Sequence, residues 1–194
     1  MSRLCVGLLG VAFFVLFPAC AREREAGAER PPVQFGFGHP ATAQETAAWD
    51  IDVRPDGTGL PPGSGTVAEG ARLYARQCAS CHGRSGREGP FDALVGSGPK
   101  DSFPFGRNPA LTRTIGNYWP YATTLYDYIN RAMPRPRPGS LTPDEIYSLV
   151  AWLLWRNGII PTEAVINAQT LPGVRMPARD RFVRDNRLGG PEIR

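Results

Sequence analysis

Cysteine and histidine are scarce in this sequence of 194 residues, which contains four Cys and two His. It shows no strand pattern longer than four residues and no internal repeat, which argues against a large sheet or a repeat protein. Lys and Arg exceed Asp and Glu by only 22 to 18 and do not cluster densely, so no nucleic-acid partner is expected. The sequence also lacks a cluster of acid, base and nucleophile, and therefore does not predict substrate chemistry of its own.

The N-terminus contains an apolar run of about fourteen residues after a single Arg. This run is too short to span a bilayer comfortably but fits a signal peptide, so residues 1–20 are predicted to direct export to the periplasm. Two processing routes stay open. Ala19-Cys20-Ala21 is an A-x-A cleavage site, whereas the loosely lipobox-like FPAC would leave Cys20 as a lipidated first residue and membrane anchor.

Helical patterns begin after a long segment that has none. Residues 21–65 are rich in Pro, Gly and small residues and predict an extended arm. A capping box formed by Thr66 and Glu69 then predicts a helix through Gln77. Gly70 inside this helix costs helix stability, which indicates a close helix crossing.

Two further helices are predicted towards the C-terminus. Residues 122–132 have apolar side chains at helical spacing, and Pro134 is expected to end this helix by moving Met133 out of helical geometry.

The last predicted helix has the strongest signals: Thr142 as N-cap, Pro143 as first residue, and Gly158 as stop. The sequence therefore predicts an all-α domain at residues 66–158, followed by an irregular C-terminal extension at residues 159–194.

Three of the six Cys and His residues lie in Cys78-Ala-Ser-Cys81-His82. This C-x-x-C-H spacing is typical of c-type haem attachment, where two thiols form thioethers to one haem and the adjacent imidazole binds the iron. Export agrees with this reading, because c-type haem is attached outside the cytoplasm. A single motif predicts one covalently attached haem c.

Two other functions for the motif are weaker. A structural disulfide or a thioredoxin-like dithiol would suit an exported chain, but a thioredoxin motif follows a strand and opens a helix, whereas here a helix comes first. A zinc site would need a fourth ligand, and only His39 or Cys20 remains to supply it.

A haem iron held by His82 needs a second axial ligand, for which the candidates are Met133, Met176 and His39. Met133 is favoured because it lies at a helix end, where the following prolines stiffen the loop and let a thioether face the iron. Met176 also precedes a proline but lies in the tail, and His39 lies in the Gly-rich arm.

Residues around the motif predict how the haem is surrounded. A metal-bound His usually donates its other ring N–H to a carbonyl or carboxylate, and the Pro90 carbonyl is the expected acceptor; an ordinary Gly-Pro turn is the alternative. Five aromatic residues either line the haem pocket or pack in the core. They are Tyr118, Trp119, Tyr121, Tyr126 and Tyr128.

The order of these features resembles a class I cytochrome c: a helix that runs into C-x-x-C-H, a Gly-Pro turn, a methionine loop and a C-terminal helix. Longer strings, within about residues 36–183, resemble the cytochrome c subunit of the bacterial Sox sulfane dehydrogenase and related sulfite dehydrogenases. These strings are residues 41–83, 115–134, 138–160 and 170–180.

The resemblance implies a periplasmic partner subunit with a molybdenum cofactor, which oxidises sulfite or carrier-bound sulfane sulfur and passes electrons to the haem. It also implies that His82 and Met133 are the axial ligands. Some family members carry a second haem domain that this chain lacks, so a downstream electron acceptor is expected to dock directly. The alternative is a free-standing periplasmic or lipid-anchored electron carrier that serves a respiratory oxidase.

Scattered large apolar side chains in both arms predict that the arms anchor this chain on the catalytic subunit, since a flexible tether would not need them. Near Met133, the charges of Arg135 and Arg137 are expected to steer the acceptor or align the partner. The apolar anchors are Phe35, Phe37, Trp49, Ile51 and Phe182.

Overall fold

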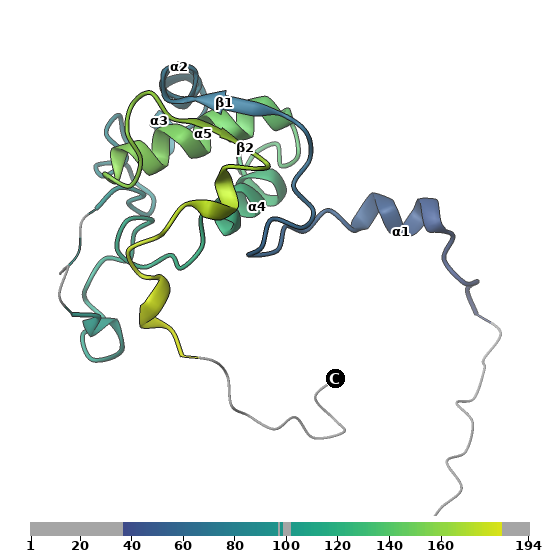
Figure 1. Cartoon of the computed structure of the whole chain (residues 1–194), viewed down its shortest axis with the longest axis horizontal. Coiled ribbons are helices and arrows are strands. Elements are labelled where there is room, and N and C mark those ends of the chain that lie inside the picture. Colours follow the sequence, from purple (N-terminus) through teal and green to yellow (C-terminus); the bar gives the residue numbers. More distant parts are fainter. Residues whose placement is uncertain (1–36, 97, 99–101, 184–194) are drawn as a thin grey trace, which may run out of the picture. The chain divides into compact units, whose positions relative to one another are not determined.

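The computed structural model describes residues 37–96, 98 and 102–183 of the chain. It is mostly helical with one short two-stranded sheet, which confirms the predicted all-α class (Figure 1). The predicted signal peptide, Cys20 and Phe35 lie outside the described residues, and the described residues 37–42 belong to a unit separate from the one that begins at Ala43. The elements are α1 (Ala43–Trp49), β1 (Ser64–Thr66), α2 (Val67–Gln77), α3 (Ala79–His82), η1 (Pro104–Gly106), α4 (Ala122–Ala132), α5 (Pro143–Arg156), β2 (Val165–Asn167), η2 (Leu171–Gly173) and η3 (Arg179–Arg181).

The three predicted helices are α2, α4 and α5, and their predicted ends are confirmed. Thr66 and Thr142 each cap a helix through a reciprocal capping box, with Glu69 and Glu145 respectively. Pro143 occupies the first turn of α5, and Gly158 follows that helix with a φ of 69°, a backbone conformation that glycine adopts at little cost.

Helices α2 and α5 cross closely, and the contact requires a glycine. A Cβ atom added at Gly70 would lie 1.9 Å from the carbonyl oxygen of Ser148 and 2.7 Å from Cβ of Trp152. One turn further along α2, the ring of Tyr74 stacks on Trp152 with 3.8 Å between centroids. The close crossing predicted from Gly70 is therefore confirmed.

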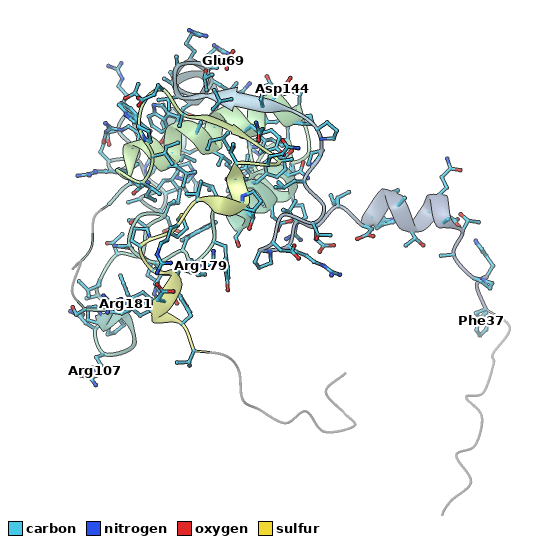
Figure 2. All side chains as sticks on the ribbon, viewed as in Figure 1. Phe37, Glu69, Arg107, Asp144, Arg179 and Arg181 are labelled. Atoms are coloured by element: carbon cyan, nitrogen blue, oxygen red, sulfur yellow. The ribbon has the colours of Figure 1, made fainter. Side chains whose placement is uncertain are left out.

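A two-stranded antiparallel sheet joins the segments on either side of the helical domain. Strand β1 pairs with β2, with Gly65 opposite Ile166, and both strands contact α5. The Asp144 carboxylate, near the start of α5, accepts a hydrogen bond of 2.7 Å from the Ser64 amide; Figure 2 labels Asp144 and the capping residue Glu69. Three-residue strands are too short for a period-2 pattern, so the sequence did not predict this pairing.

The two segments predicted to be irregular arms also differ from that expectation. Residues Ala43–Trp49 form helix α1, because this stretch of Ala, Gln and Glu favours a helix although two turns are too short to show a period. Both arms also supply buried residues to the hydrophobic core. These are Val53, Ile166, Leu171, Met176 and Ala178.

Among the described residues, none of the helices combines the length and apolar character required to cross a membrane.

Candidate functional site

The C-x-x-C-H motif forms one tight turn at the end of α2. Cys78 is the C-cap of α2, and its amide bonds the Tyr74 carbonyl at 2.9 Å. The amides of Cys81 and His82 both bond the Cys78 carbonyl, at 3.1 and 3.0 Å, which forms the single turn α3. The Tyr74 hydroxyl donates to the Gly83 carbonyl at 3.0 Å. Gly83, which follows the turn, is therefore hydrogen-bonded to α2, the helix that precedes it.

The loop after the motif orients the His82 ring. The Phe91 amide bonds the Cys81 carbonyl at 3.2 Å, which brings the chain back to the motif. The Asp92 carbonyl then lies 2.9 Å from Nδ1 of His82. The acceptor is thus Asp92 and not Pro90, because the backward turn of the loop brings the carbonyl two residues further on to the ring. When Nδ1 donates this bond, Nε2 keeps its lone pair for a metal.

Glu88 organises the same loop by accepting several hydrogen bonds. Its carboxylate accepts from the Ser85 amide at 2.9 Å, from the Arg87 amide at 3.2 Å and from the Ser85 hydroxyl. These bonds to the charged form lower the pKa of Glu88 to about 2, with the Ser85 side chain as the largest cause.

Glu88→Gln is therefore expected to weaken the loop at neutral pH. The folded pKa lies below the ordinary value of 4.5, so the Glu88 contribution is present above pH 4.5 and is lost as the pH falls towards about 2. Thermal unfolding of both proteins from pH 7 to pH 2 measures this. The gap between the two melting temperatures should close across that range; a constant gap would contradict the role of the carboxylate charge.

Met133 lies at the C-terminal end of helix α4. The last amide bond of this helix joins Met133 N to the Ile129 carbonyl at 3.0 Å, and Met133 itself has φ −125° and ψ 146°. Pro134 follows, as the sequence predicts, and ends the helix there.

A cavity of about 690 Å³ is lined both by the C-x-x-C-H motif and by the end of α4. Cys78, Cys81 and His82 line it from the motif, and Met133 lines it from the end of α4. The remaining wall is largely apolar. It includes Leu94, Ile115, Leu125, Ile129, Leu141, Leu149 and Leu153.

The exposed residues that line this cavity, here called its mouth, are mainly basic and aromatic. Phe91 and Tyr128 are about half exposed there, and the Arg135 guanidinium lies 6.0 Å from the centre of the Phe91 ring. Four arginines and a single acidic residue, Asp92, are among the lining residues. The arginines are Arg76, Arg113, Arg135 and Arg137.

The predicted aromatic group divides between both expected roles. Trp119 and Tyr128 line the cavity and meet edge to face, with 5.8 Å between centroids. Tyr126 is buried and packs on Tyr147 at 4.6 Å, so it belongs to the core. Tyr118 instead contacts Phe103, Phe105 and Phe182.

The alternative axial ligands are placed differently. Met176 is only 2% exposed and belongs to the hydrophobic core; it does not line the described cavity. The tail segment reaches the core through β2 and η2, which a sequence pattern could not show. His39 belongs to the separate unit that ends at Thr42, so its ligand role stays an alternative for experiment.

The two cysteine thiols and their surroundings are relevant to the alternative functions of the motif, namely a disulfide, a thioredoxin-like dithiol or a zinc site. Cys78 and Cys81 are both free thiols and only partly buried. Burial raises the pKa of Cys78 to about 11, with Cys81 as a second cause, whereas thiol-disulfide enzymes lower the pKa of the attacking thiol. Within the described ranges, no group of three His, Cys, Asp or Glu side chains is placed to bind a metal ion, so no zinc site is found there.

Comparison with known proteins agrees with this geometry. A chain in the crystal structure of the sulfane dehydrogenase SoxCD from Paracoccus pantotrophus is 39% identical, with a TM-score of 0.68, over 79% of this chain and 73% of that chain. The family model of the cbb3-type cytochrome c oxidase subunit III also matches this chain, at residues 65–153. The chain belongs to the class I c-type cytochromes. No curated protein sequence matches the chain significantly.

A cytochrome c domain implies haem c, and the described residues fit that group. The cavity has the size of a cofactor site and an apolar wall. It has two accessible thiols on one turn, an imidazole whose second nitrogen is already hydrogen-bonded, and a thioether from a different helix. Cys and His residues at this spacing are the donors that c-type haem requires.

Proposed function

We propose that this cytochrome is the one-haem electron-transfer subunit of a periplasmic sulfite or sulfane dehydrogenase. Cys78 and Cys81 would hold one haem c by thioether bonds, and His82 Nε2 and Met133 Sδ would be the axial ligands. The haem supplies one-electron oxidation and reduction. Because His82 and Met133 would both bind the iron, substrate would find no free position there, and oxidation of the sulfur compound would belong to a molybdenum-containing partner subunit.

The extent of the SoxCD match is the observation that supports this function most. The cytochrome family model matches residues 65–153, which is less than half of the chain, whereas the SoxCD chain matches 79% of it. The similarity therefore extends into the segments that flank the haem domain. A free-standing carrier shares the haem domain but has no need of flanking segments that resemble those of a dehydrogenase.

The N-terminal flank offers a surface for the partner subunit. None of the seven residues of α1 is buried against the described part of the chain. Trp49 is 87% exposed and Ile51 45% exposed, which is unusual for two large apolar side chains close together in sequence. Phe182, by contrast, already packs on Phe103 and Tyr118, with centroids 5.2 and 5.5 Å apart, so it is a weaker candidate anchor than the sequence implied.

The mouth of the cavity is the proposed surface for electron exchange. Aromatic and arginine side chains are enriched in protein interfaces, and the positive rim suits an acidic redox protein. The arginines would raise the association rate of such an acceptor in a salt-dependent way. Export by residues 1–20, with or without lipidation of Cys20, completes the proposal and places the subunit in the periplasm.

Purification of the native chain from its own cells tests the proposal. A molybdenum-containing subunit is expected in a one-to-one ratio with haem, measured by metal analysis and haem absorbance. A native chain that carries haem but no molybdenum partner would favour the free-standing electron carrier instead. A chain without covalent haem would contradict both.

Substitution in the full chain tests the anchoring surface. Trp49→Ala with Ile51→Ala is expected to weaken partner binding by at least about 2 kcal/mol, or about 30-fold in Kd, because exposed tryptophans are frequent binding hot spots. Arg72→Ala is the control, since Arg72 is also an exposed large side chain but lies on α2, outside both flanking segments. If the double variant binds as tightly as the control, measured by calorimetry, α1 and Ile51 form only a tether.

A trimmed domain of residues 66–158 is unsuitable for this test. It would lose β2 and most of β1, together with the buried residues Val53, Leu171 and Met176. A loss of binding in that fragment would then reflect a damaged core and not a missing anchor.

A further inference from the structure

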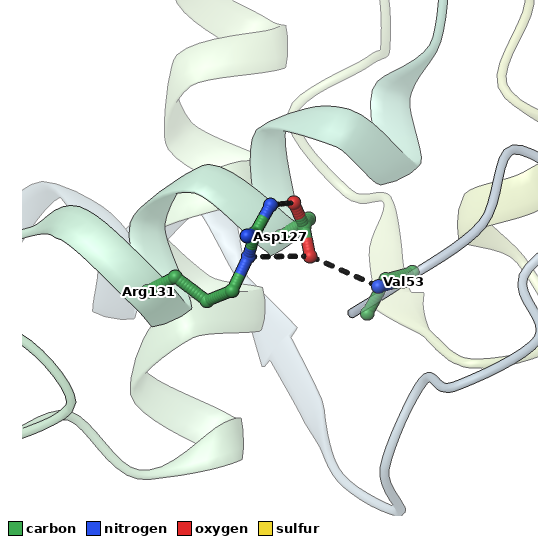
Figure 3. A network of polar contacts seen from close by, with 3 residues as sticks. All are labelled: Val53, Asp127 and Arg131. Carbon is green, nitrogen blue, oxygen red and sulfur yellow. Dashed lines mark hydrogen bonds and ion pairs between the residues drawn. The ribbon is translucent and has the colours of Figure 1, made fainter. Parts of the chain in front are cut away.

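The N-terminal segment is fastened to the helix that carries Met133 by one buried carboxylate. Helix α1 and Ile51 are exposed, and Val53, at 8% exposure, is the first buried residue after them. The Val53 amide donates a 2.9 Å hydrogen bond to Oδ1 of Asp127 in α4, 74 residues away in sequence. Figure 3 shows this contact together with Arg131.

Both carboxylate oxygens of Asp127 accept hydrogen bonds. Nε of Arg131 donates to Oδ1 of Asp127 at 3.0 Å, and a second guanidinium nitrogen donates to Oδ2. These bonds, made one helical turn apart, raise the pKa of Arg131. The Asp127 side chain is only 9% exposed, so removing its partners would leave a buried charge without compensation. The carboxylate therefore ties the last turns of α4 to the incoming segment.

The same turns of α4 form the wall of the haem cavity. Leu125 and Ile129, on either side of Asp127 in sequence, line the cavity, and Met133 follows one turn after Ile129. One face of α4 thus borders the cavity, while Asp127 joins the helix to the N-terminal segment. Movement of this end of α4 would displace the only described methionine that lines the cavity.

We infer that Asp127 is a positioning residue: by binding Val53 and Arg131, it holds the Met133 end of α4 in place for the haem iron. This inference rests on the proposed ligand role of Met133. It gives a contact outside the cavity an effect on the reduction potential of the haem. It also makes Val53 the residue that joins the exposed segment of α1 and Ile51 to α4, the helix that carries Met133.

Binding of imidazole to the oxidised, haem-loaded full chain tests the inference, because imidazole occupies the iron only when Met133 has left it. If Asp127→Ala raises the fraction of the Met-free state tenfold, imidazole binds about tenfold more tightly. Asp127→Asn keeps an acceptor for the Val53 amide and should give an intermediate affinity. The Asn variant decides the question should the Ala variant fail to fold. The weaker methionine ligation should also lower the reduction potential in the same order.

Asp144→Ala is the matched control. Asp144 likewise accepts an amide hydrogen bond from the N-terminal flank, that of Ser64, but it lies on α5, which carries no proposed ligand. Its imidazole affinity should stay within about twofold of the unmodified chain while its melting temperature falls. An equal change in the Asp144 and Asp127 variants would overturn the inference, since the effect would then be general loosening.

Met133→Ala separates this inference from the proposed function. If Met133→Ala loses the methionine-to-iron absorption band but the Asp127 variants bind imidazole like the unmodified chain, the positioning role is wrong and the ligand assignment stands. If Met133→Ala leaves the band unchanged, both are wrong.

Discussion

Met133→Ala is expected to keep the haem attached but to lower its reduction potential and to open a coordination position. A thioether ligand favours ferrous iron and raises the potential, whereas water or no ligand does not. The fall should be a substantial part of the roughly 0.8 V range over which axial ligands set haem potentials. Potentiometric titration measures the potential, and loss of the low-spin absorption spectrum reports the open position.

Met176→Ala is the internal control for this result. Met176 is buried in the core, so its removal should lower the free energy of unfolding by about 2 to 5 kcal/mol while the haem spectrum stays unchanged. His39→Ala tests the remaining alternative in the same way. A change of iron coordination in either control, with none in Met133→Ala, would reject Met133 as ligand.

Gly70→Ala is expected to destabilise the fold by about 2 to 3 kcal/mol, as overpacking usually does. The sign is informative, because the same change in an exposed helix interior stabilises by roughly 1 kcal/mol. Here the new Cβ would lie 1.9 Å from the Ser148 carbonyl oxygen, so α2 and α5 must separate. Chemical denaturation gives the difference in free energy of unfolding.

Gly173→Ala provides the comparison for Gly70→Ala. A Cβ at Gly173 meets nothing within 4 Å, and its backbone needs no left-handed conformation, so the change should stay within about 0.5 kcal/mol. A Gly70→Ala protein as stable as the Gly173→Ala protein would show that the helix crossing adapts without cost.

Separation of α2 and α5 should also reach the haem site. Tyr74 stacks on Trp152 just beyond the crossing and holds the Gly83 carbonyl at the exit of the motif. We therefore expect Gly70→Ala to show slower or less complete haem attachment during expression, measured as the ratio of haem absorbance to protein.

The helices and the motif were predictable because their signals are local. Thr66 and Thr142 satisfy free amides within three residues, and Pro134 restricts the residue next to it. The placement of Cys78, Cys81 and His82 on one turn follows from their spacing. The position of Met133 at a helix end follows from Pro134.

The acceptor for His82 was predicted two residues from its true place. A carbonyl at position 90 or 92 looks the same in sequence, since every residue has one. The choice of Asp92 depends on the path of the loop. That path is determined by the hydrogen bond from the Ser85 amide to the Glu88 carboxylate and by the one from the Phe91 amide to the Cys81 carbonyl.

The sequence by itself determined the helical class and the haem motif and predicted Met133 as the ligand, because each of these depends on residues that are neighbours in the chain. Tertiary structure alone decided that Met176 packs in the core, that β1 pairs with β2, and that Asp127 receives the Val53 amide. The last two of these contacts join residues that are at least 74 positions apart in sequence. Both use main-chain amides, which every residue except proline possesses. Long-range partners of that kind have no sequence signature, because folding selects them through burial and the path of the backbone.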